Sequence, residues 1–268
     1  MKTQNNWITS NLSGRFTNPG LDFEIKVTPT KFKYMSFEDA VIHTSKTIIN
    51  TYDNLYLSYS GGLDSEFTLF LFHQLKIPIT PIIVTFSGNE LESSYAFHMC
   101  NRLNIKPVVL ECTDAAYFEI YRSIIYEKMN GRGKRSVPNI IVQKYVDKNK
   151  GTMLTGDHLI SDLIVVNVEA SEWDFYIHTL YPETPCIGLL AYTPEIVYAT
   201  AKLYDGSNTQ EFKSRIFGLD FRPKIKHHLN SYITDNIKKL KTHIDMPKRV
   251  YTLGNKDKFL SIMESWNV

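Results

Sequence analysis

The sequence has few cysteines and no long apolar run. Its three cysteines include no close pair, so they indicate neither a disulfide framework nor a cysteine-rich zinc site, and a reducing compartment is expected. The first sixteen residues lack the apolar core of a secretory signal, and the longest apolar runs, such as residues 67–72, are far too short to cross a bilayer. The net charge of +2 predicts no strong general affinity for nucleic acid. We therefore expect a soluble, cytoplasmic protein with no membrane partner.

Strand-like and helix-like patterns alternate between residues 36 and 155. Strands are predicted at 55–60, 79–86, 106–110 and 151–155. A helix is predicted to begin at Ser36, whose side chain can cap it, with Asp39 three positions later as the reciprocal capping residue. Further helices are predicted at 63–75, 91–103, 115–129 and 137–149. This alternation predicts an α/β fold, with right-handed crossovers and a mostly parallel sheet covered by helices on both faces.

The two ends of the chain differ from this central part. Residues 1–35 are polar and irregular, and we interpret them as an N-terminal extension to an α/β core at 36–165. Residues 166–268 are predicted to be mainly helical, with helices at 193–203, 208–217 and 226–243. Residues 219–268 hold ten Lys and Arg against five Asp and Glu, which is typical either of a solvated helical face or of a surface facing RNA or a nucleotide.

Two adjacent glycines interrupt the first apolar strand and helix. The six residues Ser60-Gly61-Gly62-Leu63-Asp64-Ser65 lie where strand 55–60 gives way to helix 63–75. Backbone N–H groups converge at such a turn, the helix N-terminus adds partial positive charge, and glycines let a phosphate approach closely. A carboxylate beside a polyphosphate is repulsive unless a cation lies between them, so Asp64 points to Mg²⁺.

Other glycine motifs fit this turn less well. No lysine follows where a Walker A loop needs it, and the dinucleotide fingerprint G-x-G-x-x-G is absent. A nucleophile elbow on Ser60 would need glycine in place of Ser58. The elbow and a purely structural glycine turn stay open as alternatives.

The six residues resemble the PP-loop, S-G-G-x-D-S, of the N-type ATP pyrophosphatases. The resemblance implies an adenine nucleotide alpha-hydrolase-like, Rossmann-like domain that cleaves ATP between the α and β phosphates, adenylates a substrate and holds pyrophosphate in the loop. ATP and Mg²⁺ are the implied cofactors. We assign to the nucleotide site the loop residues and three residues near strand ends: Ser60, Gly61, Gly62, Leu63, Asp64, Ser65, Thr85, Thr155 and Gly156.

Later segments resemble the synthetase domain of asparagine synthetase, in the same order. They are Asn89-Glu90-Leu91-Glu92, Arg135-Ser136-Val137-Pro138, the stretch from Leu154 to Asp162, and Glu211-Phe212-Lys213-Ser214-Arg215. By this resemblance Asp157 orients or deprotonates an amine, Asp162 joins Asp64 on Mg²⁺, Lys213 neutralises pyrophosphate, and Arg135 pairs with a substrate carboxylate.

These four residues also have plain structural interpretations. Asp157 can be the cap of an ordinary strand-to-helix turn, and Lys213 can lie on a solvent-facing helix. Arg135 can belong to a mobile basic loop, and the extra residues after Gly156 break the family spacing at Asp162.

The chain departs from glutamine-using asparagine synthetases. Lys2 follows Met1 where those enzymes have an N-terminal cysteine, and too few residues precede the loop for a glutaminase domain. We therefore expect an acyl or carbonyl substrate with free ammonia, another amine or an ammonia-supplying partner. A thiolating or other RNA- or nucleobase-modifying enzyme, a sulfate-handling enzyme and a non-catalytic nucleotide-binding relative stay open as alternatives.

Overall fold

The structure is a computed structural model of the 268-residue chain. It describes residues 7–10, 25–127, 137–156, 180–181, 183–220, 229, 231–240 and 256–268. Within those ranges the strands are β1 (Ile8–Ser10), β2 (Ile25–Val27), β3 (Leu55–Ser58), β4 (Thr80–Thr85), β5 (Val108–Glu111), β6 (Thr152–Thr155) and β7 (Cys186–Gly188). The helices are α2 (Phe37–Thr51), α3 (Leu63–Gln74), α4 (Glu90–Arg102), α5 (Asp114–Ile120), α7 (Val137–Lys148), α10 (Pro194–Leu203), α11 (Thr209–Phe217), α12 (Ser231–Lys239) and α13 (Lys256–Ser265). A π-helical turn, Tyr121–Tyr126, continues α5, and a 3₁₀ turn, Leu189–Ala191, follows β7.

Five strands form one parallel sheet in the order β5-β4-β3-β6-β7. The chain adds β4 and β5 on one side of β3, then crosses over and adds β6 and β7 on the other side. This reversal makes the carboxyl ends of β3 and β6 a topological switch point, which is the usual place for a ligand in an open α/β sheet. The predicted α/β fold with a parallel sheet is confirmed.

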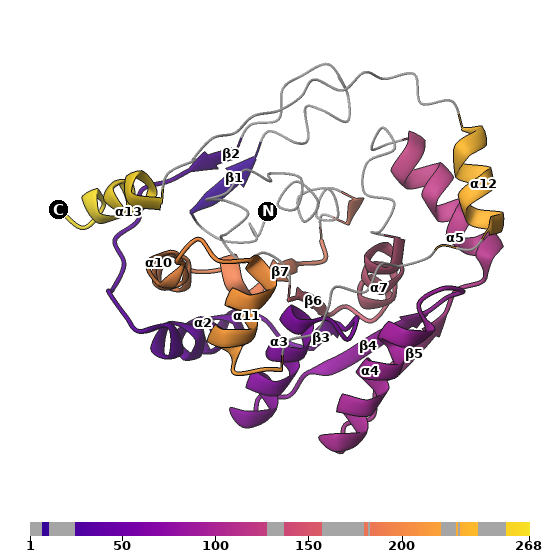
Figure 1. Cartoon of the computed structure of the whole chain (residues 1–268), viewed down its shortest axis with the longest axis horizontal. Coiled ribbons are helices and arrows are strands. Elements are labelled where there is room, and N and C mark those ends of the chain that lie inside the picture. The colour runs from indigo at the N-terminus through magenta and orange to yellow at the C-terminus, as the bar shows by residue number, and fades with distance from the viewer. Residues whose placement is uncertain are drawn as a thin grey trace.

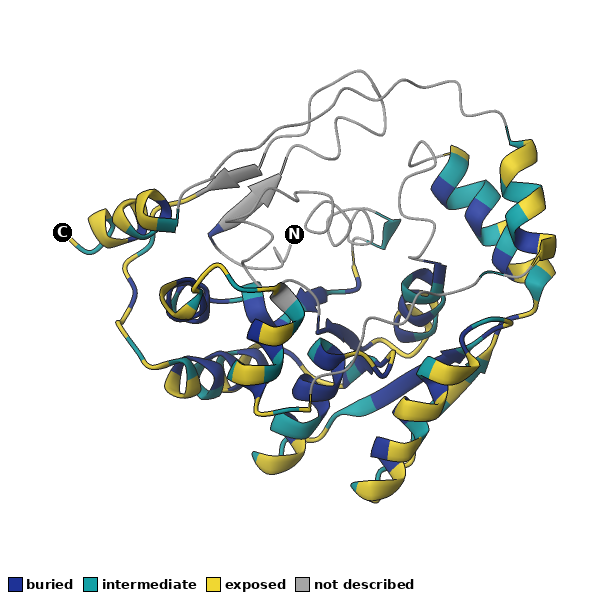
Figure 2. Cartoon of the chain, in the orientation of Figure 1, coloured by how far each residue is buried: buried dark blue, intermediate teal, exposed yellow. Residues whose placement is uncertain are grey.

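Helices cover both faces of the sheet, as predicted (Figure 1). Ile82 and Val84 of β4 pack into a core with α5, α7 and α12, whereas Ile83 packs into a second core with α2, α3 and α4. This alternation is the period of two that places successive side chains of a strand on opposite faces. Figure 2 shows that α4 is buried toward the sheet and exposed on the outside, whereas α3 is buried or half-buried along most of its length and exposed at its C-terminal end, at His73 and Gln74.

The start of α2 agrees with the sequence signal. The Ser36 hydroxyl accepts the backbone N–H of Asp39 at 3.1 Å and donates to the Asp39 carboxylate at 2.7 Å. Val41 and Ile48 of this helix face the core and are almost fully buried. After the helix, Asn54 adopts a positive φ of 50° and turns the chain into β3.

Four elements lie where the sequence predicts none. The antiparallel pair β1–β2 lies within residues 1–35, β7 adds a fifth strand after residue 165, and α13 lies near the C-terminus. The two strands of the pair and β7 are three residues long, so they are too short to show a period in the sequence. Of the helix predicted at 226–243, the structure describes residues 229 and 231–240, which include α12.

Candidate active site

The turn between β3 and α3 has the geometry of an anion-binding loop. Gly62 is the N-cap residue of α3 and, because it is glycine, offers no side-chain hydrogen bond to the first turn of the helix. The Ser60 hydroxyl accepts the N–H of Gly62 at 3.3 Å and lies 3.3 Å from the Ser65 hydroxyl, which donates to the Gly62 carbonyl at 3.1 Å. These bonds place two hydroxyl groups and a helix N-terminus at one turn, which is a suitable arrangement for phosphate.

Gly61 is required by both conformation and space. Its φ is +79°, a region that side chains with a Cβ rarely adopt. A Cβ at this position would lie 2.5 Å from the backbone oxygen of Glu92 and 3.0 Å from the backbone nitrogen of Ala96. The turn therefore packs directly against the backbone of α4.

Gly156 brings the end of β6 against the same turn. A Cβ on Gly156 would lie 2.4 Å from both the carbonyl carbon of Asp64 and the backbone nitrogen of Ser65. Two sequence-predicted segments, about ninety residues apart in the chain, are thus in backbone contact at the switch point. This close approach is a physical reason for glycine at position 156.

Thr155 and Thr85 lie at the carboxyl ends of their strands, as predicted. The Thr155 side chain is buried and donates a long hydrogen bond, 3.5 Å, to the Ile187 carbonyl of β7. The Thr85 carbonyl accepts the N–H of Cys112 at 2.8 Å, which continues the ladder between β4 and β5. Through these bonds both residues hold strand ends together near the turn.

An ion pair joins the turn to helix α11. Lys213 Nζ of α11 donates to Asp64 Oδ2 at 2.6 Å, and the two side chains are 10% and 21% exposed. The structure therefore brings the sequence-predicted lysine to the sequence-predicted loop, although 149 residues separate them. Beside an anion site, such a lysine can also bind a phosphate, and such a carboxylate can also bind the cation that accompanies the phosphate.

Asp64 suits Mg²⁺, the metal that the sequence resemblance implies. Mg²⁺ at phosphate sites is commonly held by one or two carboxylates together with phosphate oxygens and water. The Asp64 carboxylate is partly exposed at the amino end of α3 and already faces a positive charge. Within the described ranges no cluster of three His, Cys, Asp or Glu side chains could hold a metal.

Three predicted site residues lie outside the described residues. They are Arg135, Asp157 and Asp162. Their assignments stay predictions.

Two contacts near the turn were not found from the sequence. The Ser58 hydroxyl, at the end of β3, donates to Asn139 Oδ1 of α7 at 2.7 Å. Asn89 is buried, and its side chain bridges the end of β4 by accepting from Phe86 N at 2.9 Å and donating to the Val84 carbonyl at 2.8 Å. The Ser58 contact has no local sequence signal, because its partner lies 81 residues away on α7, whereas the Asn89 contacts join residues only three and five positions apart in the connection from β4 to α4.

The cysteines do not form a reactive site. Cys100, Cys112 and Cys186 are buried and none is in a disulfide. Burial raises the pKa of the Cys100 thiol to about 11, and burial together with the nearby Asp114 charge raises the pKa of Cys112 to about 11. Because the thiolate is the nucleophile in sulfur transfer, these two side chains suit packing better than catalysis.

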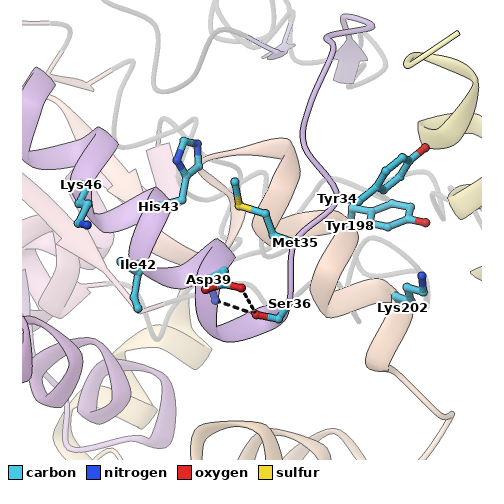
Figure 3. Close-up of a pocket in the computed structure, with 9 residues that line it drawn as sticks. All are labelled: Tyr34, Met35, Ser36, Asp39, Ile42, His43, Lys46, Tyr198 and Lys202. Carbon is cyan, nitrogen blue, oxygen red and sulfur yellow. Dashed lines mark hydrogen bonds between the residues drawn. The ribbon is translucent and has the colours of Figure 1, made fainter.

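A pocket of about 610 Å³ lies apart from the turn, between α2 and α10 (Figure 3). Tyr34 and Tyr198 line one end, with ring centroids 5.1 Å apart, and Asp39, His43 and Lys46 lie along α2. None of its lining residues belongs to the Ser60–Ser65 turn. We therefore place the candidate site at the switch point rather than in this pocket.

No protein-family model matches the sequence, and no curated protein gives a significant match. Among solved structures, the chain is similar to a protein described as a "predicted subunit of tRNA methyltransferase" from Methanocaldococcus jannaschii, with 14% identity, a TM-score of 0.38 and coverage of 65% of this chain and 94% of that one. It is similar to glutamine-dependent NAD⁺ synthetase from Acinetobacter baumannii, with 15% identity, a TM-score of 0.42 and coverage of 73% and 40%. It is also similar to NH₃-dependent NAD synthetase from Campylobacter jejuni, with 18% identity, a TM-score of 0.37 and coverage of 67% and 75%. All three TM-scores lie below 0.5, so the function proposed next rests on the geometry of the turn, and the likeness to asparagine synthetase stays a prediction.

Among the described residues, no helix is both long and apolar enough to cross a bilayer.

Proposed function

We propose that the chain is an ATP-dependent enzyme that binds the phosphates of ATP at the Ser60–Ser65 turn and cleaves ATP to AMP and pyrophosphate. The observation that carries the proposal is the meeting of three segments at the switch point. The turn begins α3, the Gly156 backbone lies against it, and Lys213 approaches Asp64 at 2.6 Å. A purely structural glycine turn does not account for a cation from a distant helix at this place.

The reaction that fits this site is adenylation followed by attack of an amine. An oxygen of a carboxylate or carbonyl group attacks the α phosphorus of ATP, the bond between that phosphorus and the bridging oxygen to the β phosphate breaks, and pyrophosphate leaves. The amine nitrogen then attacks the activated carbon, AMP leaves with the C–O electron pair, and the nitrogen loses a proton. The product is an amide when the substrate is a carboxylate.

The chain's own groups have separate roles in this proposal. The turn and Lys213 bind the β and γ phosphates, and Lys213 stabilises the negative charge of pyrophosphate as it leaves. Asp64, with Asp162 as a second proposed ligand, holds Mg²⁺, which when bound neutralises phosphate charge. We propose Asp157 as the residue that orients the amine and Arg135 as the partner of a substrate carboxylate.

The proposed partners are small molecules. They are a carboxylate or carbonyl substrate and an amine, with ammonia as the simplest amine and a separate protein as one source of it. We propose a cytoplasmic location. RNA is the less favoured substrate, because the net charge is only +2.

The test is product analysis with labelled ATP. The protein is incubated with Mg²⁺, ammonium, pooled carboxylates and nucleosides, and ATP labelled at the α or the γ phosphate. We expect α label in AMP and γ label in pyrophosphate. Asp64→Asn and Lys213→Met should each reduce turnover by about 10²-fold, which is typical for loss of one electrostatic contact to a developing charge.

Asp205→Asn is the matched control. Asp205 is an exposed carboxylate that pairs with Arg215 of the same helix as Lys213, at 2.7 Å, but it makes no contact with the turn. Its substitution should leave product formation unchanged. Release of ADP and phosphate would contradict the proposed mechanism, whereas tight ATP binding with no turnover for any substrate in the pool would favour a nucleotide-binding relative without catalysis.

A further inference from the structure

Helices α3 and α11 meet through two pairs of side chains. The first pair is Asp64 with Lys213, at 2.6 Å. The second is Phe67 with Phe217, whose ring centroids are 4.1 Å apart and whose planes differ by 10°. Asp64 and Phe67 are three residues apart on α3, and Lys213 and Phe217 are four apart on α11, so each pair of neighbours lies on one face of its helix. The ion pair and the ring stack are therefore adjacent contacts of one helix–helix interface.

The ring stack has a defined geometry. Phe67 and Phe217 are both buried, at 8% and 7% exposure. Phe37, at the start of α2, lies against both rings, with centroid distances of 6.1 Å and 6.4 Å and an angle of 28° to each. Three aromatic side chains, one each from α2, α3 and α11, thus pack together at the C-terminal end of α11.

Two further side-chain contacts of α11 join it to the segment just before it in the chain. Phe212 packs against Tyr204 with centroids 5.1 Å apart, and Arg215 pairs with Asp205 at 2.7 Å. Both partners lie in the short segment just before α11, so these contacts hold the helix to its own neighbourhood in the chain. The contacts with α3 set the distance between α11 and the turn.

We propose that Phe217, stacked on Phe67, is a positioning residue that holds the Lys213 ammonium at the Ser60–Ser65 turn. The part of this inference that concerns phosphate rests on the proposed function, whereas the part that concerns the ion pair does not. A lysine side chain has four rotatable carbons and reaches many positions, so its helix must be fixed for the ammonium to stay in one place. A misplacement of about 1 Å at a catalytic group can cost about 10²-fold in rate.

The first experiment measures the ion pair without any nucleotide. Asp64→Asn, Lys213→Met and the double variant form a double-mutant cycle in urea unfolding, carried out in the wild-type chain and again with Phe217→Leu. We expect a coupling of about tenfold in the unfolding equilibrium constant in the wild type, as for residues in contact, and a value near one with Phe217→Leu. Phe217→Met, which fills the space without a ring to stack, is the second variant if the leucine variant does not fold.

Phe72→Leu is the matched control. Phe72 is also on α3 and fully buried, but it belongs to the core that contains Leu57 and Ile83 and has no part in the ring stack. It should lower stability while leaving the Asp64–Lys213 coupling at its wild-type value. Unchanged coupling with Phe217→Leu, or equal loss of coupling with Phe72→Leu, would overturn the proposal.

The second experiment measures pyrophosphate binding by calorimetry. Phe217→Leu should weaken binding about tenfold in the wild-type chain and have no further effect in the Lys213→Met chain, because both changes remove the same contact. If Phe217→Leu weakens binding equally in both chains, it does not act through Lys213 and the proposal is wrong. If the wild type binds no pyrophosphate but the ion-pair coupling still depends on Phe217, the positioning role is kept and the proposed function fails.

Discussion

Single residues decide what this turn can bind. Asp64 at the amino end of α3 is favoured by the helix dipole, yet it would repel a phosphate that approaches the same place. Lys213 Nζ, at 2.6 Å from Asp64 Oδ2, offsets that repulsion. The two opposite charges therefore compensate each other at the turn, and each partner can exchange the other for a ligand.

The buried cysteines should be inert at neutral pH. With the pKa values of Cys100 and Cys112 raised from 9.0 to about 11, their thiolate fractions near pH 8 fall by ~100-fold. We expect iodoacetamide to modify both side chains ~100-fold more slowly in the folded protein than in urea, as followed by mass spectrometry. Fast labelling of the folded protein would contradict this prediction and favour a sulfur-transfer function.

The same shifts give a dependence of stability on pH. The unfolded chain releases these thiol protons near pH 9, whereas the folded chain keeps them to about pH 11. Their contribution to stability is therefore complete below pH 9 and falls as the pH rises from about 9 to 11. A Cys100→Ala, Cys112→Ala variant should show a smaller loss of stability over this interval in urea unfolding.

Pairs of elements set the shape of the turn. Helix α4 lies so close to Gly61 that its backbone fills the space of a Cβ there, and the backbone of the turn itself, at Asp64 and Ser65, fills the space of a Cβ on Gly156 at the end of β6. The turn is thus enclosed by backbone, which cannot move aside as a flexible side chain can. This enclosure holds the N–H groups of the turn in fixed positions, as anion binding requires.

Gly61→Ala separates the effect of this packing from the effect of backbone conformation. Gly206 has nearly the same φ, +82° against +79°, but a Cβ there would meet no atom within 4 Å. We expect Gly206→Ala to lower the free energy of unfolding by about 1 kcal/mol from conformation alone, and Gly61→Ala to lower it by about 3 kcal/mol because α4 must also shift. Equal losses in urea unfolding would show that α4 does not restrain the turn.

At the scale of the whole molecule, the described parts near the two termini meet on α10 (Figure 1). Trp7 donates to the Tyr192 carbonyl at 3.1 Å and packs edge-on against Trp266, with centroids 6.1 Å apart. The Tyr198 hydroxyl of α10 donates to Glu264 of α13 at 2.6 Å. The helix before α11 is therefore covered by segments from both ends of the chain, at the opposite side of the molecule from α5 and α12.

Trp266→Ala tests whether this cover is structural. Trp266 is partly buried, so its loss should lower the free energy of unfolding by about 2 kcal/mol, less than for a fully buried tryptophan. Tyr232→Ala on α12, where the residue is 49% exposed, should change stability by no more than about 0.5 kcal/mol. ATP affinity should be the same in both variants, and a large loss of affinity in Trp266→Ala would instead link the termini to the site.

Local signals were sufficient for much of the fold and for the loop. The Ser36 cap, the alternation of strands and helices, and the glycine turn each act within a few residues, and the structure confirms the elements that they predict. Lys213 was found only through a family resemblance, because no local feature distinguishes a buried lysine from one on a solvent-facing helix. The short strands β1, β2 and β7 were missed for a related reason, since three residues gain their hydrogen bonds from partners far along the chain.

The residues alone thus specify a parallel α/β domain with a phosphate-type turn, because hydrogen-bond capping, side-chain period and glycine conformation are properties of neighbouring residues. Only the tertiary structure puts Gly156 against Ser65, Lys213 against Asp64 and Phe217 against Phe67. These contacts depend on strand order and helix packing, which arise from the burial of apolar surface over the whole molecule. For this chain, the site is therefore a product of the fold, and the turn is the part of it that the sequence reveals.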